Sequence, residues 1–131
     1  MRFRVSNPSD LNFVLHELRK MTDEAKMNAR DSSMIITCTS ELGTNILKYA
    51  VKGFIAMRLI EDKSGSFVEV TATDRGPGIE DVNQALSDHF SSSGTLGLGL
   101  PGIKRSVDQM TIHSEPGQGT KIIIRKKMRR N

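Results

Sequence analysis

The sequence contains one cysteine and no tryptophan, and only 5% of its residues are aromatic. The single cysteine, Cys38, excludes an internal disulfide framework and any zinc site built from several cysteines. No apolar stretch approaches the roughly 20 residues that span a bilayer. The N-terminal MRFRVSNPSD has no apolar stretch after its charges, which is unlike a signal peptide. We therefore expect a cytoplasmic protein with no membrane segment.

Positive charge is in modest excess. The chain of 131 residues has a net charge of +4, and the excess is concentrated near residues 125–130. The few aromatic residues do not alternate with basic ones, as they do on surfaces that stack nucleic-acid bases. We therefore expect no nucleic-acid partner, and interpret the basic segment as a solvated terminus or as a docking patch for an acidic partner. The length predicts a single domain, residues 1–131.

Turn residues and changes of hydrophobic period divide the chain into elements. The predicted strands are 2–5, 54–60, 67–73, 110–114 and 120–126. The predicted helices are 9–26, a longer one from Asp31 to just before Gly53, and 100–110, and residues 80–96 are expected to form a mobile loop. Elements in this order predict an α/β fold, a two-layer sandwich of three helices on one mixed, mainly antiparallel sheet.

Three polar residues lie along one stripe of the second predicted helix. Because each helical residue turns by roughly 100°, Glu41, Asn45 and Lys48 project within about 60° of one another. An amide oxygen can ligate Mg²⁺, an ammonium can meet phosphate, and a carboxylate can take a proton from a hydroxyl. Considered alone, the stripe is explained more simply as a salt-bridged flank of the helix.

A second pattern follows the third predicted strand, where Asp74 precedes Gly76 and Gly78. A carboxylate at the floor of an apolar pocket can accept a hydrogen bond from the exocyclic amine of adenine. Glycines allow the backbone to come close to such a ring. Because Asp, Gly and Pro are also the usual residues of plain turns, this pattern alone favours a turn.

The third pattern, residues 93–104, lies directly before a predicted helix. Gly97 and Gly99 expose successive backbone amides, which with the helix dipole can hold a di- or triphosphate. A dinucleotide-binding fingerprint would require a strand immediately before it, and a P-loop would require lysine directly after the last glycine, where Ile103 precedes Lys104. The sequence has neither the HRD nor the DFG segment of a eukaryote-type protein kinase.

Taken in this order, the three patterns resemble the GHKL, or Bergerat-fold, ATP-binding superfamily from about residue 35 to 124. The resemblance implies that ATP and Mg²⁺ are bound, with Asn45 on the metal and Asp74 on adenine. It also implies that Thr120, in the sequence Gly-Gln-Gly-Thr, assists at adenine through water. The glycine loops, including Gly97-Leu98-Gly99, would surround the nucleotide and its lid.

Within the superfamily, the chain is most similar to the small serine-protein kinases that regulate bacterial sigma factors. Residues 91–105 resemble the RsbT type, the switch kinases of the stressosome. This resemblance implies phosphorylation of serine or threonine on a STAS-domain protein, with Glu41 as the base, and activation of a phosphatase of the PP2C type. The backbone amides of Gly97 and Gly99, helped by Lys48 or Lys104, would stabilise charge on the transferred phosphoryl group.

Two other functions remain open at this point. An anti-sigma factor, or a module in which ATP only sets the shape of the lid, would capture a partner without transfer. Lys48-Tyr49 also resembles the Asn-x-x-Lys-Tyr motif of histidine kinases, and a detached histidine-kinase domain would label histidine rather than serine. No two histidines are spaced as ligands with an acidic residue, so no metal site made by the protein alone is expected.

Overall fold

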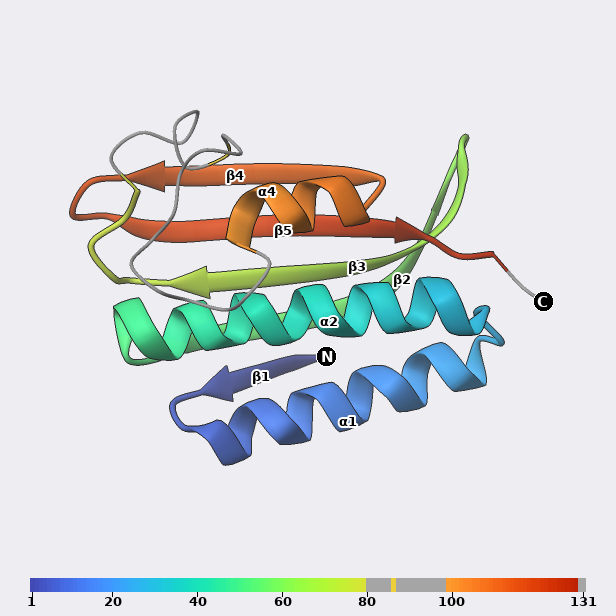
Figure 1. Cartoon of the computed structure of the whole chain (residues 1–131), viewed down its shortest axis with the longest axis horizontal. Helices are drawn as coiled ribbons and strands as arrows, with labels where there is room; N and C mark the ends of the chain where they lie inside the picture. Colours follow the sequence, from blue (N-terminus) through green and yellow to red (C-terminus); the bar gives the residue numbers. More distant parts are fainter. Residues whose placement is uncertain (80–85, 87–98, 130–131) are drawn as a thin grey trace.

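The computed structural model describes residues 1–79, 86 and 99–129. These residues form five strands, three α-helices and one π-helical turn (Figure 1). The elements in chain order are β1 Arg2–Val5, α1 Pro8–Glu24, α2 Ala29–Asn45, η1 Ile46–Ala50, β2 Gly53–Asp62, β3 Gly65–Asp74, α4 Gly99–Ser106, β4 Gln109–Glu115 and β5 Gly119–Lys127. The predicted loop 80–96 lies outside the described residues, except for Leu86.

The five strands form one sheet in the order β1-β2-β3-β5-β4, and all four pairings are antiparallel. The sequence predicted a mixed, mainly antiparallel sheet. The strands β3 and β4 do run in the same direction, but β5 lies between them and pairs antiparallel with both. The sandwich of three helices on one sheet is confirmed, and within the described residues the sheet contains no parallel pair.

Asparagine side chains cap the N-terminal ends of α1 and α2. Asn7 caps α1 by accepting a 2.8 Å hydrogen bond from the amide of Asp10, and Pro8 occupies the first turn. Asn28 caps α2 in the same way, through the amide of Asp31 at 2.8 Å. The second helix therefore begins two residues earlier than the sequence suggested. Among the described residues, no helix has the length and apolar character needed to cross a bilayer.

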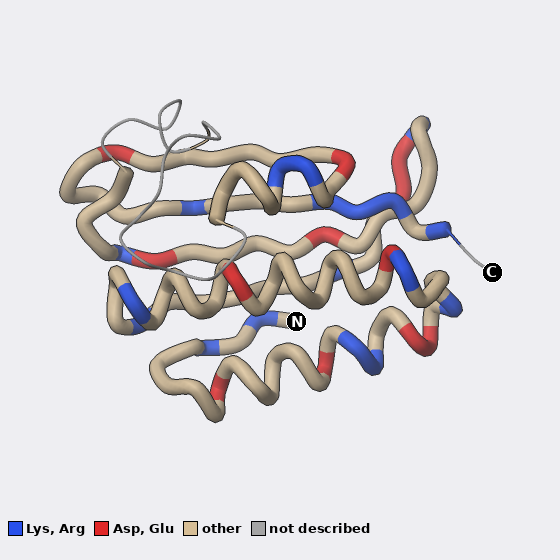
Figure 2. The backbone as a smooth tube through the Cα atoms, in the orientation of Figure 1, with Lys and Arg blue, Asp and Glu red and all other residues tan. Residues whose placement is uncertain are grey.

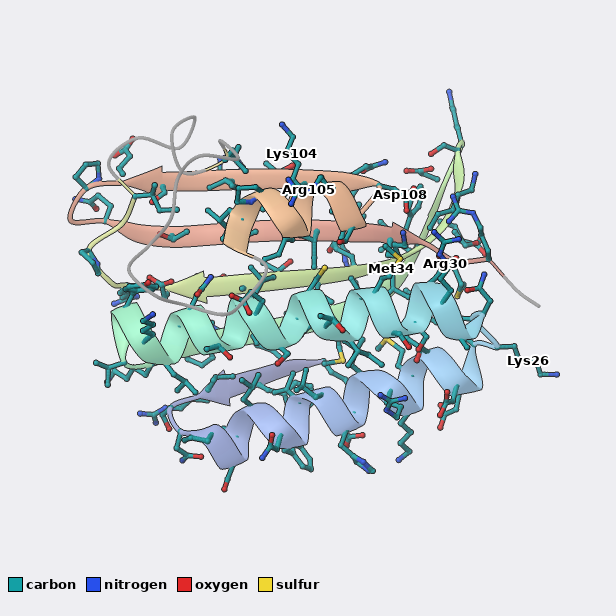
Figure 3. The ribbon with its side chains drawn as sticks, viewed as in Figure 1. Lys26, Arg30, Met34, Lys104, Arg105 and Asp108 are labelled. Carbon is teal, nitrogen blue, oxygen red and sulfur yellow. The ribbon has the colours of Figure 1, made fainter. Side chains whose placement is uncertain are left out.

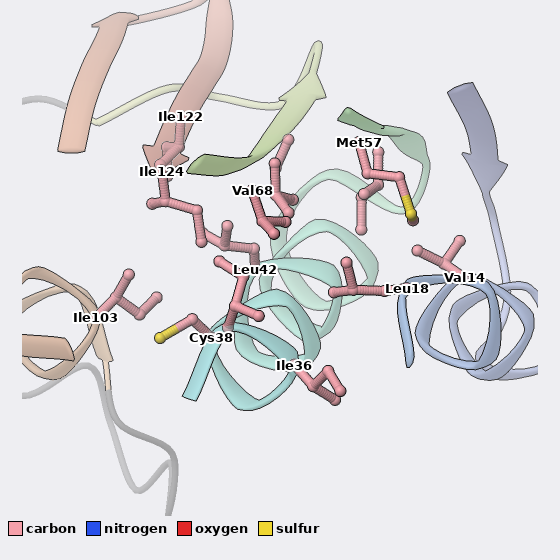
Figure 4. Close-up of a cluster of buried hydrophobic side chains, with 14 of the residues drawn as sticks. Val14, Leu18, Ile36, Cys38, Leu42, Met57, Val68, Ile103, Ile122 and Ile124 are labelled. Atoms are coloured by element: carbon pink, nitrogen blue, oxygen red, sulfur yellow. The ribbon is translucent and has the colours of Figure 1, made fainter. Parts of the chain in front are cut away.

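The core lies between the sheet and the helices (Figure 4). Alternate strand residues such as Ile55, Val70 and Ile124 point toward the helices and are fully buried. The helix α2 packs over the centre of this face between α1 and α4 (Figure 1). Burial of these side chains stabilises the sandwich by about 1.5–3 kcal/mol for each large aliphatic residue.

The second helix does not continue as an α-helix to Gly53. After Asn45 it becomes the π-helical turn Ile46–Ala50 and ends at Val51, which has φ of 71°. Single π-helical turns are rare and occur frequently at functional sites. The third helix also ends earlier than expected, at Ser106 rather than Met110.

The basic segment near residue 125 is largely used inside the molecule. Lys126 is only 7% exposed, and its ammonium donates to the Ser106 carbonyl at 2.9 Å and lies 3.8 Å from the Asp31 carboxylate. Arg129 pairs with Asp31 at 3.3 Å and with Asp108 at 3.7 Å. Figure 2 shows the basic end of β5 beside the N-terminal end of α2. Lys126 is therefore neither solvated nor available to a partner, contrary to the expectation from sequence.

Candidate functional site

Three polar residues lie side by side at one end of the sheet. Asp74 of β3 is directly opposite Thr120 of β5, which is directly opposite Ser114 of β4. Two residues further along, Ala72, Ile122 and Ile112 are aligned in the same way, and Ala72 and Ile122 belong to the core. Because side chains alternate between the two faces of a strand, Asp74, Thr120 and Ser114 share the helix-facing side.

The Asp74 carboxylate is held by the glycine that follows it. The amide of Gly76 donates to Asp74 Oδ1 at 2.8 Å, closing a short turn at the end of β3. A Cβ on Gly76 would lie 2.8 Å from the Cβ of Ala50 in η1 and 3.1 Å from Asp74 Oδ1. Glycine at this position therefore lets the loop pack against η1 without displacing the carboxylate.

The rest of the Asp-x-Gly-x-Gly loop is attached to the hairpin between β4 and β5. The amide of Gly117 donates to the Pro77 carbonyl at 2.8 Å, and the amide of Ile79 donates to Ser114 Oγ at 2.7 Å. Gly78 has φ of 79°, and a Cβ there would collide with the carbonyl oxygen of Glu115. Sequence reasoning missed Ser114, because only the strand register places it beside Thr120.

Glu41 and Asn45 lie on the side of α2 that faces α4. Figure 4 shows Cys38 of α2 directed toward Ile103 of α4, and both are fully buried. At roughly 100° per residue, Glu41 and Asn45 project within about 60° of Cys38. Neither side chain makes a hydrogen bond or an ion pair to the residues that the structure describes. Burial raises the pKa of the Cys38 thiol, with its neighbour Ser106 opposing the rise, so Cys38 is an uncharged core residue.

The two predicted lysines lie differently from each other. Lys48 belongs to the π-helical turn, so it no longer follows the α-helical stripe of Glu41 and Asn45, and its ammonium lies 5.3 Å from the ring centroid of Tyr49. Lys104 is exposed, and Figure 3 shows it projecting from α4 away from α2. Among the described residues, the structure therefore does not bring Lys104 beside the acidic and amide groups of α2.

The N-terminal end of α4 begins at Gly99, whose φ of 64° is in the left-handed region that favours glycine. Gly97 and Leu98, the other residues predicted for the phosphate loop, lie outside the described residues. Figure 1 shows the C-terminal ends of α2 and β3 and the N-terminal ends of α4 and β5 toward the same end of the molecule. The described parts of the three sequence patterns therefore lie toward one end of the molecule.

The residues of this region fit a nucleotide with a bound metal better than a metal alone. The described residues contain no group of three or more His, Cys, Asp or Glu side chains that could hold a metal ion. One amide oxygen, that of Asn45, suits Mg²⁺ when phosphates and water supply the other ligands. The Asp74 carboxylate and the Thr120 hydroxyl provide polar atoms at the end of an otherwise apolar sheet face.

Comparisons with known proteins identify relatives of this chain. The chain is 40% identical over 104 residues to the serine/threonine-protein kinase RsbT of Bacillus subtilis (strain 168), covering 79% of this chain and 78% of RsbT. It is 34% identical over 101 residues to the anti-sigma F factor of Pasteuria penetrans, covering 72% of this chain and 67% of that factor.

A solved structure of the RsbU and RsbW domains of a Mycobacterium tuberculosis protein matches all of this chain with a TM-score of 0.68. Its sequence identity is 16%, so the likeness shows the fold alone, and this chain corresponds to 33% of the length of that structure. Residues 30–130 match the family described as histidine kinase-, DNA gyrase B-, and HSP90-like ATPase. The chain therefore belongs to this ATPase family, which is the GHKL superfamily that its three sequence patterns resemble.

Proposed function

We propose that this chain is an ATP-dependent protein serine/threonine kinase that phosphorylates STAS-domain regulators in a bacterial sigma-factor or stress-signalling pathway. The observation that carries the proposal is the 40% identity to a named serine/threonine-protein kinase, in a chain that has Glu41 one helical turn before Asn45. A carboxylate next to a candidate metal ligand is what transfer to a hydroxyl requires.

In this proposal, nucleotide binding is divided among three elements. Asp74 of β3 accepts from the adenine amine, and Thr120 of β5 assists through water. Asn45 at the end of α2 is the one protein ligand of Mg²⁺, while Gly76 and Gly78 let the loop approach the base. Bound ATP supplies the phosphoryl group, and the metal neutralises part of the phosphate charge.

Catalysis depends on few side chains of this chain. Glu41 accepts the proton of the acceptor serine or threonine as its oxygen becomes the nucleophile. The backbone amides of Gly97 and Gly99 stabilise the transferred group, with Lys48 or Lys104 as a supporting cation. Of these two, Lys48 is nearer in sequence to the proposed metal ligand, because it follows Asn45 by three residues and lies in the π-helical turn.

The proposal is tested by incubating the protein with labelled ATP and a purified STAS-domain protein. We expect label on serine or threonine of that protein, mapped by mass spectrometry. Glu41→Gln should lower transfer at least about 100-fold, since a general base contributes about 10²–10⁴-fold, while leaving ATP binding intact. The control Glu24→Gln, an exposed residue at the end of α1, should transfer at the wild-type rate. Full transfer by Glu41→Gln would remove Glu41 as the base.

A second function, activation of a PP2C-type phosphatase, is part of the same proposal. It rests on the resemblance of residues 91–105 to switch kinases, which implies a second role in binding and activating a phosphatase. The measurement is phosphatase turnover with and without the chain. No increase at saturating chain concentration would exclude this role without affecting the kinase.

An anti-sigma factor, or an ATP-gated binding module, is the other candidate, and the 34% identity to an anti-sigma F factor favours it. The two candidates differ in one readout, because the module retains a partner in the presence of ATP without transferring phosphate. Nucleotide-dependent co-purification of a sigma factor, with no label on a STAS-domain protein, would select the module over the kinase.

A further inference from the structure

Ser114 has an unusual number of hydrogen-bond partners for one hydroxyl group. Its Oγ lies 2.7 Å from the amide nitrogen of Ile79, 3.0 Å from the carbonyl oxygen of Gly119 and 3.0 Å from Thr120 Oγ1. It is half-buried on the helix-facing side of β4, directly opposite Thr120.

Counting protons fixes the direction of these three hydrogen bonds. A serine hydroxyl has one proton and two lone pairs. The Gly119 carbonyl can only accept, so Ser114 donates its one proton to that carbonyl. The Ile79 amide can only donate, so its proton occupies one lone pair of Ser114 Oγ. The remaining contact must then be a donation from Thr120 Oγ1 to the second lone pair of Ser114.

This assignment determines what Thr120 presents to a ligand. Its single proton is used by Ser114, so both of its lone pairs remain as acceptors. Its neighbour Asp74 is an acceptor as well when ionised, and its Oδ1 already receives the Gly76 amide. A ligand group that meets both residues must therefore bring protons, as an amine or a donating water does.

We propose that Ser114 is a positioning residue that makes Thr120 a hydrogen-bond acceptor, so that this end of the sheet selects a 6-amino purine over a 6-oxo purine. The proposal rests on the nucleotide-binding part of the proposed function and deepens it. An adenine amine that meets both residues directly offers one proton to Asp74 and one to Thr120, with no bridging water at Thr120. A guanine carbonyl places an acceptor against two acceptors, which leaves buried polar groups unpaired.

The backbone geometry around Ser114 supports a positioning role. Ser114 joins the start of the loop, at Ile79, to the hairpin that carries Thr120. The same loop and hairpin are joined again by Gly117 and Pro77 at 2.8 Å. Removal of the Ser114 hydroxyl therefore leaves one tether in place. It frees the Thr120 proton, and it also leaves the Ile79 amide and the Gly119 carbonyl without this partner.

The experiment compares the dissociation constants of ATP and GTP by calorimetry for the wild type, Ser114→Ala and Ser114→Thr. In Ser114→Ala, the Thr120 proton is free to turn toward a ligand and to donate to a 6-oxo group. One neutral hydrogen bond corresponds to about a fivefold change in affinity, so we expect the ATP-to-GTP preference to fall about fivefold to twentyfold. Ser114→Thr retains the hydroxyl and should keep the wild-type preference.

Thr111→Ala is the matched control, because Thr111 is an exposed threonine on the same strand. It should leave both affinities unchanged, and circular dichroism should show that all variants fold. An equal loss of ATP and GTP affinity in Ser114→Ala, or an unchanged preference, would overturn the inference while leaving nucleotide binding intact. A wild-type protein that binds neither nucleotide would instead overturn the proposed function, and the inference with it.

Discussion

Glycine is required at several positions around Asp74, because neighbouring backbone occupies the place where a side chain would begin. A Cβ on Gly119 would collide with the carbonyl oxygen of Asp74 and lie 2.8 Å from the Cα of Arg75. Gly117, two residues earlier in the same turn, also has a positive φ of 78°, but a Cβ there would meet nothing within 4 Å. A side chain at Gly117 would therefore destabilise the fold through the backbone conformation alone. A side chain at Gly119 would add a steric collision to that conformational cost.

This contrast gives a prediction about stability. Gly117→Ala should lose only the conformational cost of a positive φ, about 1 kcal/mol. Gly119→Ala should lose about 3 kcal/mol or more, since the backbone of β3 or β5 must move as well. Urea unfolding of both variants measures the two losses. Equal losses would mean that β5 can move away from Asp74 without cost.

At the scale of elements, Glu69 connects three strands across the face of the sheet that carries no helix. Each of its carboxylate oxygens receives one guanidinium, Arg58 of β2 at 2.6 Å and Arg125 of β5 at 2.8 Å. Its side chain is 8% exposed. Burial alone would raise the pKa of Glu69, but hydrogen bonds from Arg58 and Arg125, together with their charges, hold it below its ordinary value of 4.5.

A lowered carboxyl pKa stabilises the folded state above the unfolded pKa, and this stabilisation is lost as the pH falls through the folded pKa. Glu69→Gln should therefore lower the free energy of unfolding by about 2 kcal/mol at neutral pH. The difference from wild type should shrink as the pH falls below about 4.5. Urea unfolding across this pH range is the measurement, with Glu24→Gln as control. A difference that stays constant with pH would contradict the prediction.

Local sequence signals predicted most helices and strands correctly. They failed at the end of α2, where contacts with other parts of the chain are close. The strands follow from alternating apolar residues, and the α1 start follows from Asn7 and Pro8. The π-helical turn could not be predicted, since Leu42 and Ile46 keep ordinary helical spacing. In the fold, Ile46 packs closely against Gly53, and Ala50 packs closely against Gly76. Val51, which follows this turn, has a positive φ of 71° that no local sequence signal indicates.

The candidate site was predictable in part for the same reason. Asp74 and Thr120 stand next to glycines in recognisable turns, so their motifs identify them. Ser114 has no such motif, because its importance depends on the register of β4 against β5. The placement of Lys104 likewise depends on which side of α4 packs against α2. The hydrophobic pattern of an eight-residue helix is too short to predict that side.

At the scale of the whole molecule, a buried ion-pair network connects regions far apart in the sequence. Asp31 in the first turn of α2 lies between Lys126 and Arg129, and Lys126 also lies 4.0 Å from Asp108. Composition suggested a basic tail for solvent or a partner. The network shows that the charge of Lys126 instead joins β5 to the start of the helix that carries Glu41 and Asn45.

Breaking one member of this network should be costly. Asp31→Asn leaves the Lys126 ammonium, whose side chain is 9% exposed, without its full charge partner, and should lower the free energy of unfolding by about 3 kcal/mol. Lys126→Met should have a smaller effect, because Asp31 keeps Arg129 as a charged partner at 3.3 Å. The double variant should lose less than the sum of the two, because it leaves no uncompensated buried charge. Strict additivity in urea unfolding would contradict the coupling.

The position of β5 between β3 and β4 has a consequence for synthesis on the ribosome. In the described sheet β4 pairs with β5 alone, and β5 is made after it, so β4 must wait unpaired until residues 119–127 emerge. Asp74 likewise gains its neighbour Thr120 only at that moment. A nascent chain that has not yet inserted β5 between β3 and β4 therefore lacks the Asp74–Thr120 side of the candidate site, so we expect nucleotide to bind there only after the sheet has closed.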